Sequence, residues 1–494
     1  MKEKKTKKSL TVSSVGDTSS GHQSSESCCA CHSFQDADET RLIRSSLLEW
    51  YDEHKRDLPW RQCSHDNQNK RLYEVWVSEI MCQQTQVVNV IPYYNKWLKR
   101  WPTVERLAKA SVDQVIEAWA GLGYYSRGRR LLEGSQVVMN DLDGKVPTTS
   151  ADLLKHLPGV GKYTACAIAS ICSGEPVGVV DGNVIRVLSR LRCIGADVSQ
   201  PSTMDSMWKL AHTLVDPDRP GDFNQAIMEL GATVCTPKNP SCSSCPAKES
   251  CNAFKKVEKE KKLKPETKSL KSVDDNKNIT DVEDLVRCPL CRPLEEPGDP
   301  DQGVMNYPHK AKKKPPREQK SGVCLVQKMT NEGQIKYLMV QRPEKGLLAS
   351  MWEFPSVELS ADCTQKHRKE EEDKYLKNKL GVIVQKVNQR TSLGDIVHIF
   401  THIRQTYEID LVVAFEDDIL ETSPSIEQNV TWVTQKDMES MGVSTAMKKV
   451  FACVDGNTTS KNKKRKLEDK KQPKLDNFFQ RKSPKKASKT SGGK

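Results

Sequence analysis

The chain has 494 residues, with 77 Lys and Arg against 65 Asp and Glu, and its formal net charge of +12 favours a polyanionic partner such as nucleic acid. It contains no apolar run long enough to cross a bilayer, and its basic start lacks the apolar core of a secretory signal, so we expect no membrane partner. The expected compartment is therefore reducing, where scattered cysteines are poor evidence for disulfides and clustered ones indicate metal sites.

Composition divides the chain into five segments. Residues 1–40 are rich in Ser and Lys and poor in large apolar side chains, which predicts a disordered segment. Residues 41–253 repeat apolar residues at helical spacing between Gly and Pro breaks, which predicts a mostly α domain. Residues 254–320 form a predicted connector, residues 321–454 combine strand patterns with a helix, and residues 455–494 form a basic tail. We therefore expect a multi-domain fold, with a mostly α domain followed by an α+β domain.

The first helical stretch that suggests chemistry is YEVWVSEIMCQQTQV, which places Glu79 among Val75, Trp76, Ile80 and Cys82. Apolar surroundings of this kind raise the pKa of a carboxyl group toward the range useful for a general acid. A lone glutamate can also be an ordinary surface residue, so Glu79 needs support from its context.

A glycine-rich turn follows in LPGVGKYTACAIAS. Its backbone N–H groups, near Gly159 and Gly161, can bind a phosphate oxygen together with the N-terminus of the next helix. Asp181 follows Tyr163 by 18 residues and comes just before another predicted helix. The turn alone is weak evidence, because many proteins have such turns.

The end of the α segment carries a cysteine cluster with the spacing C-x6-C-x2-C-x5-C, formed by Cys235, Cys242, Cys245 and Cys251. Four thiolates suit tetrahedral zinc or an iron–sulfur cluster. Zinc ribbons pair two CxxC knuckles, whereas only one pair here is that close, so the spacing favours a cubane. Four unrelated buried cysteines are the less favoured alternative.

Together, the hairpin turn, the downstream aspartate and the cysteine spacing resemble the helix-hairpin-helix DNA glycosylase superfamily of endonuclease III. This resemblance implies that the four cysteines hold a 4Fe-4S cluster. Superfamily members that cut the DNA strand carry a hairpin lysine, whose amine forms a Schiff base with the sugar. The matching residue here is Tyr163, and a phenol cannot form an imine. The resemblance therefore implies a monofunctional glycosylase, with an endonuclease III-like lyase for oxidised pyrimidines as the alternative.

Three further stretches, DLPWR, SEIMCQQTQV and GLGYYSRGRRL, resemble the MutY adenine DNA glycosylases within that superfamily. This resemblance implies that Glu79 protonates adenine at N7 and that Asp181 stabilises an oxocarbenium-like sugar, with Tyr163 and Asn183 in support. The family's leucine after the methionine is Cys82 here, which leaves a smaller side chain beside the adenine pocket.

The same resemblance implies how DNA is bound. Gln84 and Tyr124 match the residues that wedge into and stack on the duplex when the target base is extruded. Trp60 and Arg61 match the adenine pocket, although a Pro-Trp pair often only packs a helix end.

Residues 321–454 resemble the Nudix-like C-terminal domain of the same family. When the glycine of a hydrolytic Nudix box is aligned with Gly381, the carboxylates that would bind magnesium are absent, so recognition is favoured over hydrolysis. Phe400, Thr401 and His402 match the family's Phe-Ser-His loop, which reads 8-oxoguanine. A packed Phe with an incidental His is the alternative.

The connector contains RCPLC, with Cys288 and Cys291 at zinc-knuckle spacing. Vertebrate members of the family hold a linker zinc with three cysteines and one histidine, and His32 falls where that histidine would be. A third connector cysteine is missing, and a cysteine of the CCAC stretch just before His32 is a candidate replacement.

The basic tail contains QPKLDNFF, which fits the sliding-clamp (PCNA) binding pattern through Gln472, Leu475, Phe478 and Phe479. The run KNKKRK predicts nuclear localisation, against the alternative of a solvated lysine run, and a mitochondrial isoform stays open.

These observations predict a monomeric nuclear enzyme that removes adenine opposite 8-oxoguanine, or guanine, in double-stranded DNA. Its expected partners are DNA, the sliding clamp PCNA and other repair factors that bind the connector. A non-catalytic DNA-damage sensor is the alternative from another functional class, and the intact pair of Glu79 and Asp181 argues against it.

Overall fold

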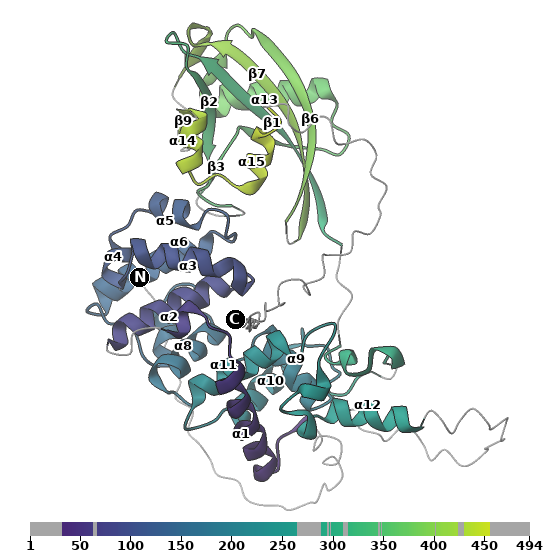
Figure 1. Ribbon diagram of the computed structural model, residues 1–494. Helices are drawn as coiled ribbons and strands as arrows, with labels where there is room; N and C mark the ends of the chain where they lie inside the picture. The colour runs from purple at the N-terminus through teal and green to yellow at the C-terminus, as the bar shows by residue number, and fades with distance from the viewer. Residues whose placement is uncertain are drawn as a thin grey trace, which may run out of the picture.

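The computed structural model describes residues 32–62, 67–263, 288–293, 296, 298–309, 315–343, 346, 348–400, 402–422 and 429–454. A helical domain and a strand-rich domain are connected by a segment that carries α12 and a 3-10 helix (Figure 1). This arrangement is the predicted mostly α domain followed by an α+β domain. Within the described part of the chain, no helix is both long and apolar enough to span a membrane.

The helical domain consists of eleven described α-helices and short 3-10 turns. Its helices are α1 (Ala37–His54), η2 (Pro59–Arg61), α2 (Gln68–Cys82), α3 (Val87–Arg100), α4 (Val104–Ala108), α5 (Val112–Trp119), α6 (Ser126–Asp141), α7 (Ser150–His156), α8 (Lys162–Ser173), α9 (Gly182–Leu191), α10 (Pro201–Leu214), α11 (Pro220–Thr233), η3 (Cys242–Ser244) and η4 (Lys248–Ser250). Side chains at their N-caps start several of them, as in α5, where Ser111 and Gln114 form a capping box.

Two hydrophobic cores divide this domain into lobes. The first core contains the buried indoles of Trp76, Trp97 and Trp119, and the second contains side chains of α1, α9, α10 and α11, including Phe223. Helix α8 contributes to both cores. Because α2 belongs to the first lobe and α9 to the second, residues on α2, α8 and the start of α9 can meet between the lobes.

The glycine-rich turn joins α7 to α8 as a helix-hairpin-helix. Gly159 has a φ of +80°, in the left-handed region that favours glycine. A Cβ at this position would lie 2.9 Å from the Arg130 side chain, so both backbone and space require glycine. Gly161 is the N-cap of α8.

The ordered fold starts earlier than composition suggests, and part of the connector is helical. Helix α1 begins at Ala37, and the side chains of His32 and Phe34 before it are buried, although residues 1–40 were expected to be disordered. The Phe34 ring packs under the Arg192 guanidinium at 4.1 Å. Within the connector, α12 (Asn252–Leu263) and η7 (Pro300–Asn306) are helical. The composition of a segment does not reveal single contacts such as that of Phe34 with Arg192.

The C-terminal domain is built on a seven-stranded mixed sheet. Its elements are β1 (Arg317–Met329), β2 (Ile335–Gln341), β3 (Trp352–Glu353), β4 (Ser356–Leu359), α13 (Gln365–Leu380), β5 (Val382–Val384), β6 (Gln389–Ile399), β7 (Ile403–Phe415), η8 (Glu416–Asp418), β8 (Ile419–Glu421), β9 (Val430–Val433), α14 (Gln435–Ser440) and α15 (Thr445–Phe451). The strand order is β3-β2-β1-β7-β6, with β4 on β1 and β9 on β2.

Strand β1 has a hydrophobic core on each face. Val323 and Leu325 point into the core that contains α15, whereas Cys324 and Val326 point into the core that contains α13. This alternation follows from the two-residue period of a strand. Strands β6 and β7 form a long antiparallel hairpin, in which β6 ends at Ile399 and β7 begins at Ile403.

The two domains touch through the segment between β2 and β3. Met351 is fully buried as part of the tryptophan-rich core of the helical domain. Arg129 on α6 donates a hydrogen bond of 3.0 Å to the Ser350 hydroxyl. These contacts place the β6–β7 turn over the loops that follow α2 and α5, with which it lines a common cleft.

Candidate active site and metal centres

Glu79 lies on α2 with 9% of its surface exposed. Burial raises the pKa of its carboxyl to about 7, a hydrogen bond with Tyr163 lowers it, the Asp181 charge raises it and the Arg61 charge lowers it. A carboxyl group with this pKa is partly protonated at neutral pH, as a general acid must be. The apolar setting predicted from the sequence is present.

Asp181 is the N-cap of α9. Its carboxylate accepts hydrogen bonds from the backbone N–H of Val184 at 2.7 Å and of Asn183 at 2.9 Å, and from Asn183 Nδ2 at 2.9 Å. Burial raises the pKa of Asp181, and these hydrogen bonds oppose that rise. Donors and a helix N-terminus stabilise the charged form. One carboxyl group is therefore prepared to carry a proton and the other to carry a negative charge.

Hydrogen bonds continue from Asp181 toward the cysteine cluster. Asn183 Oδ1 accepts from Arg186 Nη2 at 2.7 Å, and Arg186 Nε donates to the carbonyl of Cys235 at 2.7 Å. Our sequence interpretation missed Arg186. Its position three residues after Asn183 on a helix was the available signal.

Arg61 is held by two side chains of α11. Arg61 Nη2 lies 2.9 Å from Glu229 Oε2, and Arg61 Nε donates to Gln225 Oε1 at 3.1 Å. Glu229, which is 1% exposed, also binds Arg56. The sequence contains no motif that singles out these α11 residues. Trp60, the other predicted pocket residue, packs edge-on against Tyr94 at 5.3 Å.

Gln84 and Tyr124 share an unusual backbone conformation. Their φ values are 53° and 48°, in the left-handed region that residues other than glycine seldom adopt. Tyr124 is 45% exposed, which is high for an aromatic side chain. Each residue lies in a loop just after a helix, and both loops contact Arg127.

Arg127 connects these two loops as a buried cation. It donates hydrogen bonds to acceptors at the end of α2 and on both loops: Ile80 O, Met81 O, Gln83 O, Thr85 Oγ1, Leu122 O, Gly123 O and Tyr124 O. Its guanidinium also faces the rings of Trp119 and Tyr124 at 5.4 Å. Burial lowers the pKa of Arg127 to about 10, so it stays charged at neutral pH.

A cleft between the two domains brings predicted DNA-binding residues together. It has about 1370 Å³ of empty space, and Gln84 and Tyr124 face it from one domain, Phe400 and His402 from the other. The Phe400 ring packs edge-on against His398 at 4.6 Å. Thr401, between them, lies outside the described residues.

The four clustered cysteines surround a small cavity beside α9. Cys235, Cys242, Cys245 and Cys251 line about 320 Å³ of empty space together with Arg190. Arg190 is 3% exposed, and its Nη1 lies 3.2 Å from Cys235 Sγ. A buried cation suits a centre with four thiolates. Burial raises the pKa of the Cys245 thiol to about 11 and of the Cys251 thiol to about 12, so a metal must displace their protons.

The structure also contains a tighter group of potential metal ligands. In the part of the chain that the structure describes, three ligand atoms within 4.8 Å of one another occur in one group, and it does not include these cysteines. Four cysteine sulfurs around one cavity, with the Arg190 cation beside them, form a donor set that fits an iron–sulfur cluster.

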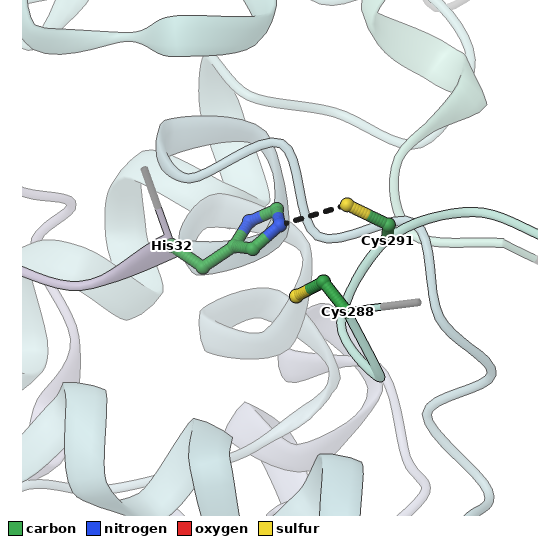
Figure 2. Close-up of side chains that lie close together, drawn as sticks. All are labelled: His32, Cys288 and Cys291. Carbon is green, nitrogen blue, oxygen red and sulfur yellow. Dashed lines mark hydrogen bonds between the residues drawn. The ribbon is translucent and has the colours of Figure 1, made fainter. Parts of the chain in front are cut away.

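That one group consists of His32, Cys288 and Cys291 (Figure 2). His32 Nδ1 lies 2.7 Å from the Arg192 carbonyl oxygen, and Nε2 lies 3.2 Å from Cys291 Sγ. Because a carbonyl only accepts, Nδ1 carries the hydrogen and Nε2 keeps its lone pair for a ligand. The candidate fourth ligands at residues 28, 29 and 31 lie outside the described residues, as do Gln472, Leu475, Phe478 and Phe479.

Comparisons with known proteins agree with this geometry. The model of the HhH-GPD superfamily base excision DNA repair proteins matches residues 77–212, and the model of the NUDIX domain matches residues 324–453. The adenine DNA glycosylase of Homo sapiens is 46% identical over 86% of this chain and 76% of its own length. That of Schizosaccharomyces pombe is 36% identical over 88% of this chain and 94% of its own length.

Among solved structures, the C-terminal domain of mouse MUTYH in complex with human PCNA is 31% identical to this chain. It has a TM-score of 0.24, covering 33% of this chain and 100% of that one. The extent and identity of the sequence matches show that the chain belongs to the adenine DNA glycosylase family, and it is a DNA glycosylase of base excision repair.

Proposed function

We propose that this adenine DNA glycosylase acts on adenine paired with 8-oxoguanine, hydrolyses the N-glycosidic bond and leaves the DNA strand intact. The observation that carries the proposal is the pairing of Glu79, whose pKa is near 7, with Asp181, which accepts three hydrogen bonds. Both lie between the lobes, because Glu79 belongs to α2 of the first lobe and Asp181 caps α9 of the second.

Glu79 acts as the general acid. Adenine leaves poorly as an anion, so a proton from Glu79 to N7 converts it into a neutral leaving group. Burial keeps part of the Glu79 population protonated at neutral pH. The Arg61 charge acts in the other direction, which keeps that pKa from rising further.

Asp181 stabilises the sugar once the bond breaks. The departing adenine leaves an oxocarbenium-like ring, and a fixed carboxylate nearby lowers the free energy of that state. As in retaining glycosidases, the carboxylate can form a bond to C1′ before water completes hydrolysis. Asn183 fixes the carboxylate through two of its three hydrogen bonds. Tyr163 cannot form a Schiff base, so strand cleavage is not expected.

The second domain identifies the base opposite adenine. Phe400, Thr401 and His402 read 8-oxoguanine, while Gln84 and Tyr124 replace and stack on bases of the opened duplex. Their support is the cleft that four of these residues share across the domain boundary.

The experiment that tests this proposal is a single-turnover assay on duplexes with adenine opposite 8-oxoguanine or guanine, quenched with and without hot alkali. We expect DNA strand breaks only after alkali treatment, and faster excision of adenine opposite 8-oxoguanine than opposite guanine. His402→Ala should remove most of this preference, whereas His367→Ala, an exposed histidine on α13, should keep it. Breaks without alkali would instead support the endonuclease III-like lyase.

We also propose that Cys235, Cys242, Cys245 and Cys251 hold a 4Fe-4S cluster and that His32, Cys288 and Cys291 hold zinc. The cluster would hold the loop between these cysteines rigid, so that the loop can position DNA. The zinc would fix the connector to the segment before α1, next to Arg192.

The two centres respond separately to mutation. The double variant Cys288→Ser and Cys291→Ser should lose its zinc and keep its iron and sulfide, because the cluster cysteines belong to another segment. Cys363→Ser, in the C-terminal domain, is the matched control and should keep both. Metal analysis of the purified proteins measures this, and unchanged zinc in the double variant would refute the zinc site.

We further propose that Gln472, Leu475, Phe478 and Phe479 bind the sliding clamp, and that residues 461–466 direct the chain to the nucleus. Two adjacent aromatic residues in a charged tail support the first proposal, and a run of lysine and arginine supports the second. If the double variant Phe478→Ala and Phe479→Ala binds the sliding clamp with unchanged affinity, the first proposal is wrong. If a chain without residues 461–466 still enters the nucleus, the second proposal is wrong.

A further inference from the structure

A methionine of α11 lies against the catalytic tyrosine. Tyr163 Oη donates a hydrogen bond to Met228 Sδ at 3.2 Å. Met228 occupies the same helical face as Gln225 and Glu229, which hold Arg61. Helix α11 therefore contacts the site through three neighbouring residues, and Met228 is the one that reaches the group beside Glu79.

The chemistry of this contact fixes the direction of the hydrogen bond. A thioether sulfur carries no hydrogen and can only accept, so the hydroxyl hydrogen of Tyr163 points toward Met228. A hydroxyl has one hydrogen, and the same hydroxyl also interacts with Glu79. While Tyr163 donates to the sulfur, it can only accept from Glu79. A carboxyl group can donate only when it is protonated.

We propose that Met228 is a positioning residue, whose sulfur holds the hydroxyl hydrogen of Tyr163 and thereby favours the protonated form of Glu79. This inference rests on the proposed role of Glu79 as the general acid. When Glu79 is ionised, Tyr163 turns its hydrogen toward the carboxylate and the bond to sulfur is lost. The sulfur therefore stabilises the acid form selectively.

Other charged and titratable groups face the same carboxyl. Tyr163 on α8, Asp181 before α9 and Arg61 on η2 act on Glu79 directly, and Cys82 follows it on α2. Arg56 and Arg127 act on Cys82. A substitution of Met228 leaves all of them in place, so the change in proton affinity of Glu79 can be assigned to the sulfur.

The test is Met228→Leu, which keeps a similar apolar volume but removes the acceptor. The second-order rate constant for adenine excision is measured against pH for the full, metal-loaded chain. We expect the alkaline limb to move to lower pH by about half a pH unit, the size expected from one weak hydrogen bond. Met204→Leu, a half-buried methionine of α10 in the same core, should keep the original limb.

A second variant shows whether the effect passes through the hydroxyl. In a Tyr163→Phe background, Met228→Leu should cause no further shift of the limb, because no hydroxyl remains to be held. An unmoved limb in Met228→Leu, or an equal shift in the phenylalanine background, would overturn the role of Met228. If the unmodified enzyme lacks an alkaline limb, the general-acid role of Glu79 is itself wrong, which is a different result.

Discussion

Replacing Glu79 by glutamine is expected to reduce adenine excision by about 10²–10⁴-fold, the usual contribution of a general acid. Glutamine has nearly the shape of glutamic acid but no proton to give to N7. A single-turnover assay on DNA with adenine opposite 8-oxoguanine measures the loss. DNA affinity, measured by titration of the same duplex, should change little, because the carboxyl group is buried away from the phosphate backbone.

Glu74→Gln is the matched control for this variant. Glu74 lies on the same helix, is 8% exposed and interacts with Lys70 at 3.7 Å. It should excise adenine at nearly the original rate. Equal rates for Glu79→Gln and the unmodified chain would exclude this residue as the acid. Unchanged binding with no excision in the unmodified chain would favour the non-catalytic sensor.

The pKa of Glu79 also sets the pH dependence. Because burial raises it to about 7, the acid form dominates below that pH and disappears as the pH rises above it. The second-order rate constant reports groups of the free enzyme, so it should decline across this range.

The sequence reveals those site residues whose surroundings are determined by their neighbours in the chain. Glu79, Asp181 and the hairpin glycines stand in short stretches whose neighbours determine their setting, and the structure places both carboxyl groups between the lobes. The apolar residues around Glu79 on one helix were enough to predict its burial. The class of the fold followed from helical and strand periods in the same way.

The residues that the sequence did not reveal act across long chain separations. Glu229 holds Arg56, 173 residues away, and Met228 reaches Tyr163 over 65 residues. Their types, an acidic residue and a methionine in an apolar helix, fit many structural roles. His32 was named as a candidate metal ligand, but the order of the segment around it was not predicted, since that segment is held by contacts with Arg192.

Buried or half-buried arginines are the common feature of these distant contacts. Arg61 is fixed by α11, Arg186 joins Asn183 to the carbonyl of Cys235, and Arg190 faces the cluster cysteines. Arginine suits this role because it stays charged when buried and has five donors in a fixed plane. The geometry of the site thus depends on cations that neither give the proton to adenine nor stabilise the sugar.

Arg127 is a further buried arginine, and Arg127→Met is expected to destabilise the chain by about 3–4 kcal/mol. Methionine fills much of the same space but leaves several buried carbonyl oxygens without a donor. Unfolding temperature should fall by about 6–16 °C. The loops of Gln84 and Tyr124 lose their common partner, so excision should fall even at temperatures where the variant is folded.

Arg130→Met is the appropriate comparison, because Arg130 lies on the same helix, is exposed and has the same charge. Its unfolding temperature should change little. Thermal unfolding followed by circular dichroism measures the stability of each variant. The single-turnover rate of adenine excision, measured well below the unfolding temperature, shows whether the loops of Gln84 and Tyr124 still function. If Arg127→Met and Arg130→Met unfold at the same temperature, the carbonyl oxygens around residue 127 have other hydrogen-bond donors. A stable fold with slow excision would separate the role of Arg127 in the loops from its role in the core.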